Sequence, residues 1–159
     1  MANISYNAFD VANAFIAIAK KEGRTLTNLQ LQKLVYIAFG YFAGLMNDRL
    51  FPETIEAWNY GPVIPDLYHE LKQYGVGAVT DALPSRNTIN GGGAEITIID
   101  AVWESYGMYS PLELSSLTHK EGTPWKVTRD KTKNRRHAEI SFGLIREHYQ
   151  KLIKERMRG

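Results

Sequence analysis

The segment from residue 26 to residue 45 constrains the fold most, because its apolar side chains cover more than one side of a helix. Thr27 and Gln30 have the spacing of a capping box, in which each side chain bonds a free backbone N–H at the helix start. Apolar residues then recur at helical spacing over about four turns: Leu31, Leu34, Val35, Ala38, Tyr41, Phe42 and Leu45. We expect this helix at the centre of a helical bundle, because it needs cover on several sides.

Five further segments show amphipathic helical spacing. They are residues 7–22, 62–75, 99–107, 111–117 and 144–153. Gly23 suits the end of the first segment. Ser110, Pro111 and Glu113 suit the start of the fourth, as an N-cap, a first-turn proline and the acid of a capping box. The β-branched run at 96–99 leaves a strand open as the alternative to a helix that starts near residue 99.

Outside these helical segments, the sequence shows little strand pattern, which favours a mostly α fold. Residues 50–58 alternate weakly, as a short strand would. We therefore predict a compact helical bundle of about five or six helices, with room for a short β-hairpin or strand pair. The chain of 159 residues has ordinary hydrophobic and charged fractions and suits one domain over residues 1–159. Residues 75–95 are rich in glycine and small polar side chains, which predicts a flexible surface loop.

The composition and spacing exclude several classes of chemistry. The chain has no cysteine, which rules out disulfides, thiolate metal sites and a cysteine nucleophile. Its four histidines lack metal-binding spacing, and the glycine run at 91–93 lacks the following lysine of a phosphate-binding loop. We therefore expect no enzyme, no cofactor and no metal site. We expect a cytoplasmic protein, because there is no signal sequence and no run near the roughly 20 apolar residues that cross a bilayer.

Positive charge is concentrated in the last quarter of the chain. From Lys120 onward there are twelve Lys or Arg residues and five acids, a net charge of +7, while the seven basic and twelve acidic residues before it give −5. The basic segment at about 126–137 would gain affinity for phosphates by releasing counterions. It lacks interleaved aromatic residues, so a solvated loop or an acidic protein partner explains it as well. Nucleic acid is therefore the less favoured partner.

Residues 55–63 combine a tryptophan with a tight turn. Gly61 and Pro62 allow a sharp change of direction beside Trp58 and a fixed start for the next helix. We favour this architectural role, because tryptophan is highly buried on average. Tyrosine and tryptophan beside exposed turns also anchor protein interfaces, so direct contact with a partner is the alternative.

Four segments in this order resemble the Panacea domain family, which includes SocA-like antitoxins and GepA-like proteins of mobile elements and phages. The segments are "LTNLQLQKLVYIAFGYF" (26–42), "LFPETIEAWNYGPVIPDLYHELKQYG" (50–75), "LELSSLTHKEGTPW" (112–125) and "ISFGLIREHY" (140–149). The most specific pieces are Leu31-Gln32-Lys33-Leu34, Glu56-Ala57-Trp58 with Gly61-Pro62-Val63, and Leu117-Thr118-His119 with Pro124-Trp125. The resemblance covers nearly the whole chain, although the loop at 75–93 looks longer than the linker usual in the family.

The resemblance implies a mostly helical cytoplasmic domain that acts by binding another protein, most often by neutralising a toxin encoded beside it. It therefore points to a non-catalytic antitoxin of a toxin–antitoxin module, with a toxin as the protein partner. A phage or mobile-element protein that inhibits a host defence protein is one alternative. A nucleic-acid-binding regulator that uses the basic segment is another.

Aromatic and basic side chains near the turn and in the basic segment are the expected partner contacts: Trp58, Tyr60, His119, Trp125, Arg129, Arg135 and Arg136. We also expect His119 and Trp125 to pack against the turn beside Trp58, which would place both signatures on one side of the fold. For His119 taken alone, a hydrogen bond at a helix end is the favoured role.

Overall fold

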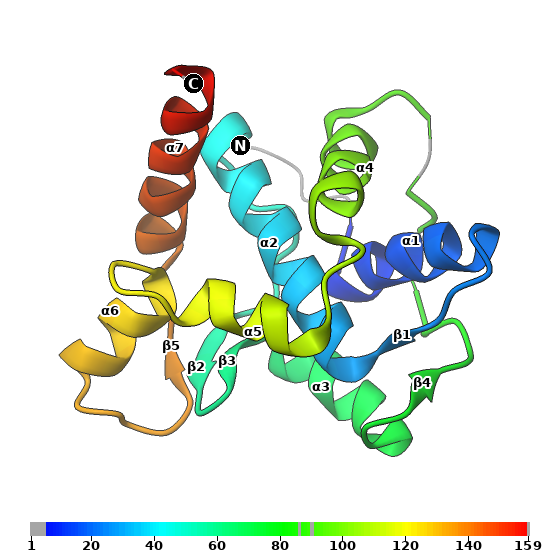
Figure 1. Ribbon diagram of the computed structural model, residues 1–159, viewed down its shortest axis with the longest axis horizontal. Helices are drawn as coiled ribbons and strands as arrows, with labels where there is room; N and C mark the ends of the chain where they lie inside the picture. The colour runs from blue at the N-terminus through cyan, green and yellow to red at the C-terminus, as the bar shows by residue number, and fades with distance from the viewer. Residues whose placement is uncertain (1–5, 86, 90, 159) are drawn as a thin grey trace.

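The computed structural model of the protein describes residues 6–85, 87–89 and 91–158, and most of these residues are helical (Figure 1). The helices are α1 (Ala8–Lys21), α2 (Asn28–Met46), α3 (Pro65–Leu71) with a following 3₁₀ turn η1 (Lys72–Tyr74), α4 (Ala94–Tyr106), α5 (Pro111–His119), α6 (Pro124–Lys131) and α7 (Phe142–Arg158). The mostly α prediction is confirmed. The described part of the chain has seven α-helices, where about five or six were expected.

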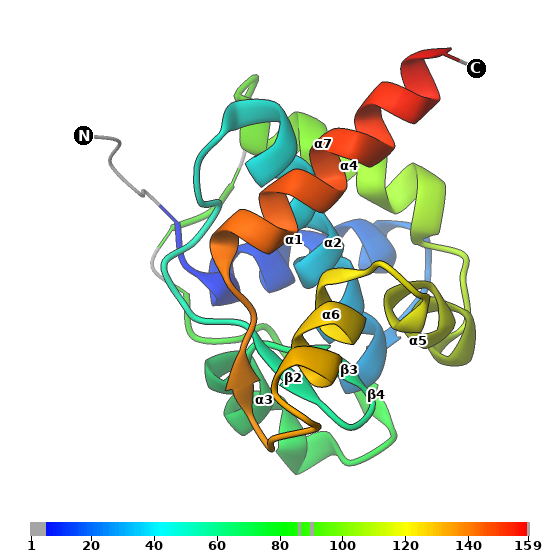
Figure 2. The ribbon, with the colours of Figure 1, turned by 90° about the vertical axis from the view of Figure 1, so that its left-hand side faces the viewer.

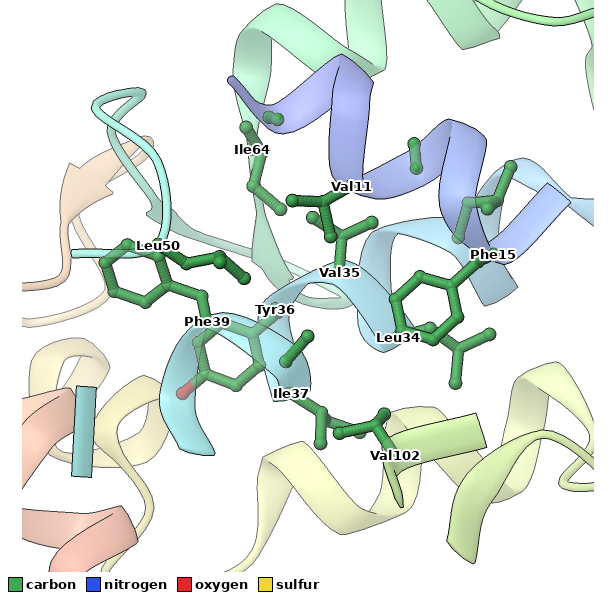
Figure 3. Packing of buried hydrophobic residues seen from close by; sticks show 14 of the residues in the cluster. Val11, Phe15, Leu34, Val35, Tyr36, Ile37, Phe39, Leu50, Ile64 and Val102 are labelled. Carbon is green, nitrogen blue, oxygen red and sulfur yellow. The ribbon is translucent and has the colours of Figure 1, made fainter. Parts of the chain in front are cut away.

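Helix α2 is the centre of the molecule. Every residue from 31 to 43 is buried, and α1, α4, α5 and α7 all contact this helix. Both bonds of the capping box are present, from Gln30 N to Thr27 Oγ1 at 3.2 Å and from Thr27 N to Gln30 Oε1 at 3.0 Å. Side chains such as Val11 of α1 and Val102 of α4 pack against α2 in the core (Figure 3). The predicted central position of this helix is confirmed.

Two small antiparallel sheets complete the fold. The three-stranded sheet has the order β3 (Gly61–Val63), β2 (Glu56–Trp58) and β5 (Ala138–Glu139) (Figure 2). Trp58 pairs with Gly61, so Asn59 and Tyr60 form the tip of a tight hairpin. The second sheet pairs β1 (Leu26–Thr27) with β4 (Ala78–Val79). The short hairpin for which the sequence left room is present, but of residues 50–58, which alternate as a strand would, only 56–58 form one. In addition, β5 adds a strand from the basic end of the chain that the sequence did not predict.

Two helices differ from the sequence-based expectation. Helix α4 begins at Ala94, with Ile98 and Ile99 buried, so the strand alternative for residues 96–99 is wrong. Packing of these side chains against the core outweighs their weak preference for strands. Helix α6 covers the start of the basic segment, where the sequence pattern predicts no helix. The hydroxyl of Thr123 caps it by accepting the Lys126 N–H at 3.3 Å.

The glycine-rich connection between η1 and α4 is fastened to the core at several points. Val79, Leu83 and Ile89 are buried. Asn13 of α1 exchanges two hydrogen bonds of 2.8 Å with the backbone of Leu83. The flexibility expected for residues 75–95 stays a prediction, and residues 86 and 90 of this connection lie outside the described part of the chain.

Candidate functional site

The corner, by which we mean the β2–β3 hairpin at residues 56–63, is fastened to α2 by two polar side chains. Gln32 accepts the backbone N–H of Ile64 on Oε1 at 2.9 Å. Lys33, which is fully buried, donates from Nζ to the carbonyl of Pro62 at 3.1 Å. These side chains pair two backbone groups, one in the edge strand β3 and one just after it. Helix α2 therefore fixes where the corner sits.

Burial changes the chemistry of Lys33. No carboxylate in the described residues forms a salt bridge with its amine. Desolvation lowers the pKa of Lys33 from its ordinary 10.5 to about 7. Gly61 permits the close approach, because a Cβ added at this position, where φ is +118°, would lie 2.9 Å from Lys33 Cε. The corner thus depends on a close fit between a glycine and a buried amine.

Helices α5 and α6 pack against the corner. Trp125 donates from Nε1 to the carbonyl of Trp58 at 2.6 Å, and Ser115 donates from Oγ to the carbonyl of Tyr60 at 3.2 Å. His119, the last residue of α5, donates from Nδ1 to the carbonyl of Ser115 at 2.6 Å. The His119 and Trp125 rings are 4.0 Å apart between centroids. The expected packing of this segment against the corner and the helix-end hydrogen bond of His119 are therefore confirmed.

The basic segment folds back over the corner. Arg129 of α6 donates to the carbonyl of Ala57 at 3.4 Å and to Asn59 Oδ1 at 3.0 Å. His137, just before β5, has a left-handed backbone with φ of 59° and stacks on the Trp58 ring with centroids 4.3 Å apart. Lys126, by contrast, forms a salt bridge with Asp130 at 2.8 Å. Only part of the basic segment is thus directed toward the corner.

A cavity of 570 Å³, which we call the corner pocket, lies between α2, the corner and the basic segment. Much of its wall is apolar or aromatic: Leu29, Trp58, Tyr60, Val63, Tyr68 and Val76. The lining residues that carry a formal charge are all basic, namely Lys33, Arg129 and Arg136, and no acidic residue in the described part of the chain lines the cavity. Its volume lies within the range of about 300–1,000 Å³ that is usual for ligand-binding pockets.

The seven predicted contact residues occupy different places around this pocket. Four of them line it: Trp58, Tyr60, Arg129 and Arg136. His119 and Trp125 pack behind the corner and support it. Arg135 is exposed and does not line the pocket. The role of these residues in partner binding stays a prediction.

Sequence reasoning missed Gln32 and Lys33 as residues that build the site. A signal for them was present, because this polar pair interrupts an apolar run inside the central helix. A buried amine at such a place needs a specific acceptor, since burying an unpaired polar group is costly. His137 gave no comparable signal, because its position over Trp58 depends on the pairing of β5 with β2.

The polar side chains at the corner mostly bond backbone carbonyls, which stiffens the surface they support. In residues 6–85, 87–89 and 91–158, no group of three or more His, Asp or Glu side chains is arranged to hold a metal ion. Among the same residues, none of the helices has the length and apolar character needed to cross a bilayer. The arrangement is a hairpin held by several hydrogen bonds, with a pocket beside it.

The chain is similar to known proteins over the region that builds this site. A family model described as "Antitoxin SocA-like, Panacea domain" matches residues 31–126, which include most of α2, the corner and α5. Antitoxin SocA of Caulobacter vibrioides (strain NA1000 / CB15N) is 28% identical over 165 residues, covering 97% of this chain and 84% of that protein. No solved structure matches the chain significantly.

Proposed function

Because this chain belongs to the Antitoxin SocA-like, Panacea domain family, we propose that it is an antitoxin that neutralises a cognate toxin by binding it. The proposal includes no chemical step. The toxin would be held by surface complementarity, and neutralisation would last as long as the complex. The observation that carries the proposal is that the family match covers the corner and most of α2, which line much of the corner pocket.

The construction of the corner supports a binding role. Trp125, Ser115 and Lys33 each donate to a backbone carbonyl of the hairpin, so the hairpin is supported on both sides. A surface fixed before the partner arrives loses little conformational entropy on binding. At its tip, Tyr60 remains 78% exposed although it is a large aromatic side chain. Tyrosine is among the residues that contribute most to binding energy at protein interfaces.

Co-expression tests the proposal directly. The product of the gene beside this one is expressed from an inducible promoter in a bacterial host, with and without this chain. We expect growth arrest with the neighbouring protein alone, restored growth when both are present, and a stable complex on size-exclusion chromatography. A neighbouring product that stays toxic in the presence of this chain, or that fails to bind it, would contradict the proposal.

A further inference from the structure

We propose that the corner pocket binds a segment of the partner in which a carboxylate lies next to an apolar side chain. This inference rests on the proposed function, because it assigns the chemistry of the partner at the same site. It specifies what the pocket selects: an apolar group for its aromatic wall and a negative charge for its basic side chains.

The apolar part of the inference rests on side chains that the fold leaves uncovered. Tyr60 is 78% exposed and Val76 is 98% exposed, and both line the pocket. Behind them, Trp58 packs on Tyr68 with ring centroids 4.9 Å apart. Large apolar side chains left exposed around a pocket favour an interaction site, because exposing them to water is unfavourable.

The charged part rests on basic residues without acidic partners. Arg129 and Arg136 both line the pocket, and neither forms a salt bridge in the described part of the chain, where Lys126 is the residue that does. Arg129 bonds only neutral acceptors, the carbonyl of Ala57 and the amide oxygen of Asn59. Lys33 is buried between α2 and the corner and lines the pocket. When protonated, its amine adds positive electrostatic potential inside the pocket. A carboxylate is the protein group that complements this field.

The same features favour a protein segment over a nucleic acid. Binding of single strands needs a groove in which a row of cations follows the phosphate backbone. Here the exposed cation that lines the pocket is Arg136, while Arg129 is partly buried and Lys126 is paired with Asp130. A single carboxylate needs no such row. An acidic peptide is therefore the occupant that the geometry favours.

The chain offers a direct readout of pocket occupancy, because its three tryptophans occupy different environments. Trp58 lines the pocket, and its indole N–H donates to Glu56, which does not line it. The Trp125 indole N–H donates to the carbonyl of Trp58. The Trp103 indole N–H donates to Glu22 of α1 and does not line the pocket. Indole signals in a ¹⁵N-correlation spectrum therefore report separately on the pocket and on a distant control position.

The experiment begins with a displayed library of random 12-residue peptides selected against the purified full chain. Enriched peptides are synthesised and titrated while the three indole signals are followed. We expect enriched peptides to place Asp or Glu within two residues of an apolar side chain, and to shift the Trp58 signal while that of Trp103 stays in place. Replacing the peptide's Asp by Asn, or its Glu by Gln, should weaken binding about tenfold.

Neighbouring arginines supply a matched control. Arg136→Gln should weaken binding of the acidic peptide about fivefold, whereas Arg135→Gln, next to it but outside the pocket, should change it less than about twofold.

The inference is overturned if no peptide is enriched, if the amide peptides bind equally well, if Arg135→Gln has the larger effect, or if only a single-stranded oligonucleotide moves the Trp58 signal. A toxin that is still neutralised and bound normally by Arg136→Gln would overturn this inference alone, whereas failure of wild-type neutralisation would overturn the proposed function.

Discussion

Gly61 and Lys33 depend on each other, although they belong to different motifs in the sequence. A Cβ at position 61 would lie 2.9 Å from Lys33 Cε and 3.1 Å from Thr118 Oγ1. Because residue 61 has no side chain, the hairpin lies close enough to α2 for the buried Lys33 amine to reach the carbonyl of Pro62. The close contact between these two residues therefore explains why the corner needs a glycine at position 61 and why a lysine of the central helix is buried beside it.

Gly61→Ala should lower the free energy of unfolding by about 2 kcal/mol or more, because it adds a steric overlap to an unfavourable backbone conformation. Urea denaturation measures the change. Gly122→Ala is the matched control: its φ is +83°, but an added Cβ has no neighbour within 4 Å. It should show the backbone cost alone, about 1 kcal/mol. Equal losses in the two variants would contradict the close fit at the corner.

Lys33 should make stability depend on pH between 7 and 10.5. The folded chain releases the proton near pH 7 and the unfolded chain near 10.5, so the unfolded state binds more protons in this window. The free energy of unfolding therefore rises with pH there, and this contribution is constant below and above the window. Relative to Lys33→Met, the wild type should gain about 2 kcal/mol between pH 7 and pH 9.

Chemical denaturation of both proteins at the two pH values gives this difference directly. Taking the difference between wild type and Lys33→Met removes the contribution of the tyrosines, which also titrate at alkaline pH. A difference in stability that does not change with pH would show that Lys33 keeps an ordinary pKa in the folded protein.

Among single residues, the sequence predicted those pocket-lining side chains whose chemical type alone suggests contact. Trp58, Tyr60 and Arg129 were identified because aromatic and arginine side chains favour interfaces. Lys33 was missed because lysine is almost never fully buried, so its place between apolar residues of the central helix was not taken as a sign of burial.

Among the elements, the crossing of α2 and α7 depends on two glycines. A Cβ added at Gly40 would overlap the ring of Tyr149, and one added at Gly44 would lie 3.0 Å from Ile153 Cδ1. The absence of side chains at both positions lets α7 approach α2 closely. Tyr149 is buried by this contact and packs edge-on against Tyr41, with ring centroids 4.9 Å apart. The position of the long C-terminal helix α7 is therefore set by its close approach to the backbone of α2 at these glycines.

Gly40→Ala should destabilise the protein by about 2 kcal/mol, since overpacking of the core outweighs the gain in helix propensity. Thermal unfolding followed by circular dichroism checks the prediction. The matched control is Gly143→Ala near the start of α7, where an added Cβ has no neighbour within 4 Å. That variant should be neutral or slightly more stable. A neutral Gly40→Ala would mean that α7 does not pack on α2 as described.

Element starts were predictable where capping chemistry marked them. Thr27 and Ser110 both form the capping boxes that the sequence indicated. Other elements carried weaker signals: the β-branched residues at 96–99 obscured the start of α4, and α6 has only eight residues. Strand β5 has two residues and exists through its pairing with β2 more than eighty positions earlier, a long-range contact that local patterns do not encode.

For the whole molecule, the fold brings the basic end of the chain onto the corner. Helix α6 and strand β5 lie beside β2, so Arg129 and Arg136 reach a pocket whose other walls come from the more acidic first three quarters of the sequence. A charge asymmetry along the sequence thereby becomes a local positive field. The β2–β3 hairpin, which lines the pocket, lies far from the last turn of α7, as both views of the ribbon show (Figures 1 and 2).

The dissociation constant between the chain and the product of the neighbouring gene, measured by isothermal titration calorimetry, tests whether the corner pocket holds the partner. Tyr60→Ser changes an exposed aromatic side chain at the mouth of the pocket, and Met157→Ser changes an apolar side chain that is 84% exposed in the last turn of α7. We predict that Tyr60→Ser weakens binding about tenfold and that Met157→Ser changes it less than about twofold. Equal effects of the two substitutions, or a larger effect of Met157→Ser, would contradict the claim that the corner pocket holds the partner.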